Sequence, residues 1–266
     1  MTRLRPAPGW LEQHARRAMQ PPLRPRVSLW WEAGRIGSVE PEFVERSGLA
    51  GWALLPHQRG GEQGWRLRGQ DLSETLATVA LSLRERDLCH VWRDELLAVR
   101  DEAGQVLGAV ERAATRVLGI ATDAVHLAAV DEEGRHWVQR RALDKPTDPG
   151  LWDTLVGGAI PASDTLELAL ERETWEEAGL RLPQLRDLRH GGRVRTQRPS
   201  EVAHGYIVEW LDWYTCTVPA GVVPRNQDGE VAEFRRMDAA QVTERLERDE
   251  FTIDAAQILL AAFSTS

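Results

Sequence analysis

The spacing of apolar residues predicts helices and a hairpin in the first part of the chain. Apolar residues recur at helical spacing from Leu72 to Leu83, directly after Asp71–Glu74, a stretch typical of an N-terminal capping box. A helix is therefore expected to about residue 86, and a shorter one over residues 10–19. Two short strands, 95–100 and 105–111, flank a glycine-containing turn and are expected to form a hairpin.

From about residue 118 onward the pattern predicts strands that enclose helices. The strands are expected at 124–130, 136–141, 155–156, 192–196, 203–210 and 213–217, and the helices at 164–178, 239–248 and 254–263. Elements in this mixed order are typical of a layered α/β or α+β domain. We place a boundary near residues 112–118. This predicts a smaller α+β N-terminal domain (1–113) and a second domain (114–266).

Composition and charge narrow the possible partners. The 266 residues carry a net charge of −8, and the pI is about 5.5. Broad binding to nucleic acid or anionic membranes requires a basic face, so neither partner is expected. No run of roughly 18 apolar residues predicts a membrane helix, and the N-terminus does not resemble a secretory signal. Cys89 and Cys216 lack metal-site spacing, which favours reduced thiols and a cytoplasmic location.

The segment with the strongest chemical signal is the acidic helix expected at 164–178. Relative to Glu173, Glu176 lies about 60° to one side and Glu177 about 40° to the other on a helix. Three carboxylates this close repel one another unless a cation lies among them. A hard divalent ion such as magnesium prefers carboxylate and carbonyl oxygens. Arg172 lies beside Glu176 and can offset part of the charge.

The full spacing of this segment resembles the Nudix box. That pattern is Gly, five residues, Glu, seven residues, Arg-Glu, an aliphatic, any residue, Glu-Glu, any residue, Gly and an aliphatic. The matching residues are Gly158, Arg172, Glu173, Glu176, Glu177, Gly179 and Leu180. Two positions depart from the pattern, Asp164 in place of Glu and Thr174 in place of an aliphatic residue. We expect Asp164 to cap the helix with Glu167 completing a capping box, which would loosen Arg172.

The resemblance implies a Nudix α/β/α sandwich and a metal-dependent hydrolase. The Gly158 carbonyl with Glu173, Glu176 and Glu177 would bind one to three magnesium or manganese ions, braced by Arg172. Bound metal lowers the pKa of water and neutralises the phosphates of a diphosphate. A carboxylate would complete proton removal. Glu177, Glu201 and Glu230 are the open candidates for this base.

A wider resemblance points to the Nudix domain that fungi carry fused to thiamine pyrophosphokinase, which also has an extra N-terminal domain. It rests on Glu111-Arg-Ala, Gly119-Ile, Val125-His-Leu, Arg140-Arg, Lys145, Pro149-Gly, Trp152-Asp, Val156-Gly-Gly and Phe251-Thr-Ile-Asp-Ala-Ala. It implies hydrolysis of thiamine diphosphate, or of its oxidised forms, to the monophosphate. A nucleoside-diphosphate-like substrate stays open. Four residues near the metal loop are candidates for substrate binding: Arg140, Arg141, Lys145 and Trp152.

Two other functions are compatible with this fold. A Nudix-like isopentenyl diphosphate isomerase requires an essential cysteine and a His-rich metal site, whereas Cys216 follows the box with no histidine cluster. A non-catalytic sensor would bind a ligand through the Nudix domain, but such proteins often lose the box carboxylates that are kept here. The sequence leaves open whether the protein forms a homodimer. Three roles stay open for residues 1–110: they could cover the substrate pocket, form a dimer interface or support the fold.

Overall fold

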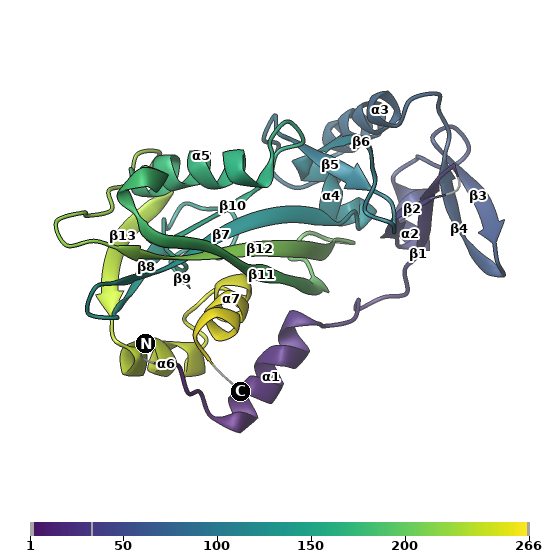
Figure 1. Ribbon diagram of the computed structural model, residues 1–266. Coiled ribbons are helices and arrows are strands. Elements are labelled where there is room, and N and C mark those ends of the chain that lie inside the picture. The colour runs from purple at the N-terminus through teal and green to yellow at the C-terminus, as the bar shows by residue number, and fades with distance from the viewer. Residues whose placement is uncertain (1–2, 33, 265–266) are drawn as a thin grey trace.

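The computed structural model describes residues 3–32 and 34–264, which form three sheets and seven α-helices (Figure 1). The helices are α1 (Pro8–Ala18), α2 (Pro41–Arg46), α3 (Leu72–Glu85), α4 (Arg112–Leu118), α5 (Leu166–Ala178), α6 (Ala239–Glu247) and α7 (Ile253–Phe263). The strands are β1 (Val27–Trp31), β2 (Gly34–Val39), β3 (Leu54–Arg59), β4 (Glu62–Leu67), β5 (Leu96–Arg100), β6 (Val106–Glu111), β7 (Thr122–Asp131), β8 (His136–Arg141), β9 (Trp152–Asp153), β10 (Val156–Ala159), β11 (Arg186–Pro199), β12 (Tyr206–Val218) and β13 (Val231–Met237).

The largest sheet is built around β7. Its order is β11-β12-β7-β8-β13, with β7 and β12 parallel and the neighbouring pairs antiparallel. One edge of β7 is divided between two partners, because β10 pairs with residues 124–127 and β8 with residues 129–130. The glycine pair at 157–158 lies in β10, beside β7 and in contact with α5. This division therefore sets the place where the acidic helix meets the sheet.

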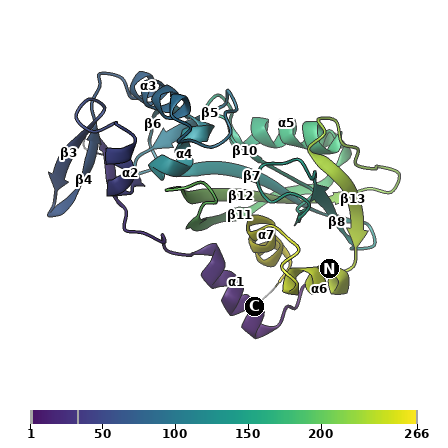
Figure 2. The same ribbon diagram turned by 180° about the vertical axis from the view of Figure 1, so that it is seen from behind.

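Helices cover both faces of this sheet. α5 lies on one face, whereas α6 and α7 lie on the other (Figures 1 and 2). A hydrophobic cluster that includes Leu127, Leu155 and Leu170 fills the α5 side. A second cluster, which includes Val242 and Leu259, fills the opposite side. The α/β/α sandwich with a mixed sheet is thus confirmed. No helix in the described part of the chain is long and apolar enough to cross a membrane.

The N-terminal half has its own sheet, hairpin and helix around a separate hydrophobic cluster. A sheet of order β2-β1-β4-β3, the β5–β6 hairpin and α3 share a hydrophobic cluster that runs from Leu29 to Ile120. α1 lies instead beside α7 (Figure 1), where His14 Nε2 lies 2.9 Å from Gln257 Oε1. The first helix therefore packs on the last one. The division at residues 113/114 stays a prediction.

Most expected elements are present, with some differences at long strands and edges. The expected strands at 203–210 and 213–217 are one strand, β12, which begins at Tyr206, because its parallel pairing with β7 continues without a break from Glu209 to Val218. The β1–β4 sheet, α2, α4 and β13 were not predicted. β4 begins with the polar pair Glu62-Gln63, and the adjacent Arg235 and Arg236 interrupt the apolar residues of β13, so neither sequence shows a clear apolar alternation. Gly179 ends α5 at a φ of 62°, as predicted.

One buried histidine in β8 makes stability depend on pH. His136 is 1% exposed, and neither ring nitrogen has a hydrogen-bond partner. Its ring packs edge-on against Phe263, with centroids 4.6 Å apart. Burial lowers the pKa of His136 from 6.5 to about 4 despite the opposing charges of Asp131 and Asp238. The folded protein therefore holds this imidazole neutral over a pH range where the unfolded chain binds a proton.

We expect the free energy of unfolding to fall as the pH drops from 6.5 toward 4, because only the unfolded state then gains the proton. Between pH 8 and pH 5, the titration of His136 should lower the free energy of unfolding by about 2 kcal/mol. Urea unfolding of the natural protein and of His136→Leu at both pH values measures it, since other titrations cancel in the difference. An equal pH dependence in the two proteins would contradict the assignment.

Candidate functional site

The acidic helix α5 is anchored to the sheet by one small apolar face. Ala169, Leu170 and Ala178 are buried in the cluster on that side. Thr174, where the Nudix pattern has an aliphatic residue, is fully buried, and its hydroxyl donates to the Leu170 carbonyl at 2.6 Å. A threonine is therefore accommodated without an unsatisfied polar group.

The first turn of α5 differs from the expectation. Thr165 is the N-cap, and its side chain accepts a hydrogen bond from the Leu168 amide at 3.3 Å. The expected cap at Asp164 with Glu167 is therefore wrong. Asp164 lies one residue too early, and its carboxylate instead accepts a 3.1 Å hydrogen bond from Arg172 Nε. The shorter Asp side chain still reaches its Arg partner, so Arg172 is not loosened.

Arg172 is the centre of a network of carboxylates. Besides Asp164, its Nη1 donates to Glu173 at 2.8 Å and to Glu176 at 3.0 Å, and its Nη2 lies 3.4 Å from the Ala159 carbonyl. Burial opposes ionisation of the guanidinium, but the neighbouring carboxylates, Glu173 first, outweigh it and raise the pKa of Arg172. One cation thus holds two of the box carboxylates at the cavity.

The carboxyl group of Glu173 lies directly against Gly158. A Cβ atom at position 158 would lie 2.2 Å from Glu173 Cδ, so only glycine leaves room for this carboxyl group. The Glu173 side chain is 12% exposed. Burial raises the pKa of Glu173 to about 7, although Arg172 works in the opposite direction. A carboxyl group in this state gains from an additional nearby cation.

Glu177 lies deeper than the other two glutamates. It accepts hydrogen bonds from Gln139 Nε2 and from the Gly157 amide, both at 2.9 Å, and Lys145 Nζ lies 4.0 Å away. Burial raises the pKa of Glu177 to about 8. Gln139 was missed in the sequence. Because side chains alternate along a strand, its place two residues before the candidate Arg141 on β8 was the available signal.

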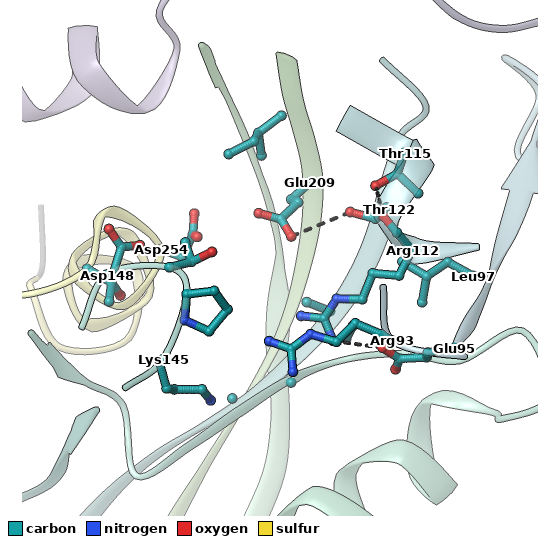
Figure 3. Close-up of a pocket in the computed structure, with 18 of the residues that line it drawn as sticks. Arg93, Glu95, Leu97, Arg112, Thr115, Thr122, Lys145, Asp148, Glu209 and Asp254 are labelled. Atoms are coloured by element: carbon teal, nitrogen blue, oxygen red, sulfur yellow. Dashed lines mark hydrogen bonds and ion pairs between the residues drawn. The ribbon is translucent and has the colours of Figure 1, made fainter. Parts of the chain in front are cut away.

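These groups border a cavity of about 360 Å³ (Figure 3). Its wall on the Nudix-box side includes Gly157, Gly158, Arg172, Glu173 and Glu176, while Glu177 lies behind that wall. Other lining residues come from residues 90–120 of the N-terminal half, from β7, β9, β11 and β12, from the loops after β8 and before β13, and from the start of α7. The cavity therefore lies between the two halves of the chain.

Two of the four candidate substrate-binding residues line this cavity. Arg141 Nη1 lies 3.3 Å from Asp153 Oδ2, and Lys145 forms an ion pair with Glu230. Arg140 lies outside the lining set and faces Glu233 at 3.6 Å on the exposed side of β8. Trp152 is also outside it. It is 5% exposed and packs in the cluster on the α6–α7 side of the sheet.

The three candidate bases occupy different positions. Glu201 is not among the cavity-lining residues, and its carboxylate is bound to Arg116. Glu230 lines the cavity. Burial opposes ionisation of Glu230, but its hydrogen bond to Lys145 and the charge of Lys145 outweigh it and lower the pKa. Glu230 is thus a carboxylate that remains ionised at the cavity.

The end of the cavity away from the Nudix box is acidic. Asp148, Glu209 and Asp254 gather there in Figure 3. Arg198 donates to both oxygens of Asp254, at 3.0 and 2.8 Å, and outweighs burial to lower the pKa of Asp254. Glu209 has weaker partners: Thr122 Oγ1 at 3.5 Å and Arg198 at 4.0 Å. Burial, followed by the charge of Asp254, raises the pKa of Glu209.

The residues predicted to hold metal fit a hard cation by chemistry. Glu173 and Glu176 supply oxygen donors at the cavity, and Gly158 is kept free of a side chain that would displace Glu173. Within residues 3–32 and 34–264, no three His, Cys, Asp or Glu side chains converge on one metal position. In this arrangement Arg172 is the cation between Glu173 and Glu176. The ligand set therefore stays a prediction.

A protein-family model matches the second half of the chain. Residues 121–259, just over half of the chain, match the family model described as the NUDIX domain. The chain is 29% identical over 198 residues to "Nudix hydrolase 20, chloroplastic" of Arabidopsis thaliana, covering 68% of this chain and 49% of that protein. It is 32% identical over 168 residues to an isopentenyl-diphosphate Delta-isomerase of Streptomyces griseus, covering 63% of this chain and 83% of the isomerase. This chain thus spans about half the length of the plant relative.

Among solved structures, DR0079 of Deinococcus radiodurans superimposes with a TM-score of 0.51 at 21% identity. The match covers 62% of this chain and 97% of that one. At this level of identity the likeness concerns the fold alone. It agrees with the layered sandwich described above.

The contact between Gly158 and Glu173 predicts that adding a methyl group at position 158 destabilises the protein. We expect Gly158→Ala to lower the free energy of unfolding by about 1–3 kcal/mol, because the new Cβ overlaps a carboxyl group that Arg172 holds in place. Gly9→Ala is the control, since a Cβ there meets nothing within 4 Å. Urea unfolding measures both. A Gly158→Ala variant as stable as the natural protein would show that Glu173 moves aside freely.

Proposed function

The chain belongs to the Nudix family, and we propose that it hydrolyses a phosphoanhydride bond in a small diphosphate with the help of magnesium or manganese. The observation that carries this proposal is the box itself: Arg172, Glu173 and Glu176 gather beside Gly158 at one wall of a cavity. Nudix hydrolases generally use divalent metals.

The proposed roles follow from burial and hydrogen bonding. Glu173, Glu176 and Glu177, with the Gly158 carbonyl, would hold the metal, which neutralises phosphate charge and activates water when bound. Arg172 keeps Glu173 and Glu176 at the cavity wall. Gln139 and the Gly157 amide hold the Glu177 carboxylate in place by hydrogen bonds.

We assign proton removal from water to Glu230 rather than to Glu201 or Glu177. Among the three, Glu230 lines the cavity, whereas Glu201 is bound to Arg116 and Glu177 lies behind the wall. The ion pair with Lys145 keeps Glu230 ionised and able to accept a proton. Lys145 and Arg141 are the proposed phosphate contacts on this side.

We propose a thiamine-diphosphate-like substrate, with a nucleoside-diphosphate-like one as the alternative. The acidic end of the cavity supports this choice, because a cationic ring or an amino-substituted heterocycle would find an acceptor in Glu209. Asp148 adds negative charge nearby. A phosphate group at the box end would then place the organic group at the acidic end.

A substrate panel tests the activity. We expect chelator-sensitive release of phosphate product from thiamine diphosphate or its oxidised forms, and less from nucleoside diphosphate sugars, ADP-ribose, dinucleotides and nucleoside triphosphates. Glu176→Gln should lower kcat by about 100-fold or more, since it removes a metal-binding charge without changing shape. Metal binding without cleavage of any compound would favour a ligand sensor. Unchanged turnover in Glu176→Gln would remove this residue from the metal set.

Glu209 offers a separate test of the substrate assignment. We expect Glu209→Gln to lower kcat/KM for thiamine diphosphate about tenfold, because a charge-assisted contact to the organic group is lost. Dimethylallyl diphosphate, whose organic group is uncharged and lacks donors, is the comparison substrate and should be little affected. Steady-state kinetics measures kcat/KM of the natural protein and of Glu209→Gln on both substrates. Equal losses on the two would assign Glu209 a structural role.

The likeness to isopentenyl-diphosphate isomerases does not lead us to propose that reaction. Cys216 is 4% exposed and packs in the cluster between the sheet and α5. Burial raises the pKa of the Cys216 thiol to about 12. Neither Cys216 nor Cys89 lines the cavity. A reactive thiol needs a lowered pKa and access to substrate, and these cysteines provide neither.

A further inference from the structure

One wall of the cavity comes from the N-terminal half of the chain. Arg93 lies just before β5, and Arg112 opens α4 directly after β6. Both side chains extend into the cavity, while Lys145 enters from the other side (Figure 3). Two guanidinium groups from this half thus lie across the cavity from the residues of the Nudix domain.

The backbone around Arg93 is held by a buried carboxylate. Glu111, which is 4% exposed, accepts hydrogen bonds from the amides of Arg93 at 3.0 Å and of Glu95 at 3.1 Å. The same residue caps α4, accepting from the Ala113 amide at 3.4 Å. Arg93 and Arg112 are therefore fixed relative to each other by one side chain.

Arg93 differs from the other basic residues of the cavity lining in its lack of an ion pair, and Arg112 differs from them in its exposure. Five other basic side chains in the lining are each bound to a carboxylate: Arg116 to Glu201, Arg141 to Asp153, Lys145 to Glu230, Arg172 to Glu173 and Arg198 to Asp254. Arg112 has one partner, Glu95 at 2.7 Å, and 46% of its side chain is exposed. Arg93 forms no ion pair with any described residue. Arg93 is thus left without a carboxylate partner among the described residues, and Arg112 has the most exposed side chain of the paired basic residues in the lining.

Their chemistry suits a phosphate group. A guanidinium group presents several N–H donors in a plane and binds phosphate oxygens in pairs. Arg172 is already shared among three carboxylates, so the Nudix-box wall has no free side-chain cation for a second phosphate group. A second phosphate group, which is also anionic, therefore needs cationic side chains on another wall of the cavity.

We propose that Arg93 and Arg112 form a phosphate subsite that the N-terminal half contributes to the active site. This proposal rests on the proposed hydrolysis of a diphosphate, whose second phosphate group it would bind. The N-terminal half then has a direct part in substrate binding, in addition to supporting the fold.

Equilibrium binding of methylenediphosphonate, a diphosphate mimic that cannot be hydrolysed at its bridge, tests the subsite without turnover. With the full chain and magnesium present, we expect Arg93→Gln and Arg112→Gln each to weaken binding roughly 10- to 100-fold. Arg66→Gln is the matched control, an exposed arginine on β4 that does not line the cavity. Calorimetry gives the dissociation constants, and steady-state kinetics should show a rise in KM that exceeds any fall in kcat.

A second pair of variants separates binding from folding. Arg112→Gln leaves Glu95 without its partner, so Arg112→Gln combined with Glu95→Gln restores neutrality and should bind as weakly as Arg112→Gln alone. Arg93→Lys should bind between the natural protein and Arg93→Gln, because charge is kept and the planar donors are lost. Binding unchanged in Arg93→Gln and in the double variant would overturn the subsite.

The two proposals fail in different ways. If the natural protein binds methylenediphosphonate but hydrolyses no diphosphate, the hydrolase fails while the arginine variants still test the subsite. If hydrolysis is chelator-sensitive but the arginine variants bind and turn over normally, the hydrolase stands and the subsite is wrong.

Discussion

The site depends on one guanidinium group among three carboxylates. Asp164, which precedes α5, and Glu173 and Glu176, which lie within it, would repel one another, and Arg172 contacts all three. Hydrogen bonds between charged partners are worth about 1.5–3 kcal/mol each, enough to hold side chains that would otherwise turn toward solvent. Gly158 makes the arrangement sterically possible, because any side chain there would overlap Glu173.

The divided edge of β7 places this local network at the wall of a cavity. Because β8 and β10 pair with different parts of β7, the strand that carries Gly157 and Gly158 begins where the β8 pairing ends. Gln139 on β8 can then reach Glu177 under α5. The same geometry leaves the far side of the cavity to be closed by residues 90–116, so the N-terminal half and the Nudix domain share one site.

Charge pairing explains how an acidic protein can present a cavity suited to an anion. Most basic residues in the lining are bound to carboxylates, so they fix the walls more than they attract a ligand. Arg93, which has no ion pair among the described residues, and the exposed Arg112 lie on the N-terminal wall, whereas Glu209 lies at the acidic end. A net charge of −8 is therefore no obstacle to binding phosphate locally.

The sequence by itself determined the acidic helix, its C-terminal glycine and the layered fold, because these depend on short-range spacing: helical periodicity, a left-handed position that favours glycine, and fixed intervals between carboxylates. The sequence also identified Lys145 and Arg141, which line the cavity, as candidates for substrate binding. It could not place Arg140 and Trp152 away from the cavity, since the side of a strand that faces a cavity depends on how β8 pairs with β9 and β13. Arg93, Arg112, Gln139 and Glu209 lie far from the box in sequence and meet it only through sheet pairing and the packing of the two halves. Long-range contacts of this kind leave no periodic signal in the chain, so the tertiary structure alone decided which residues share the cavity.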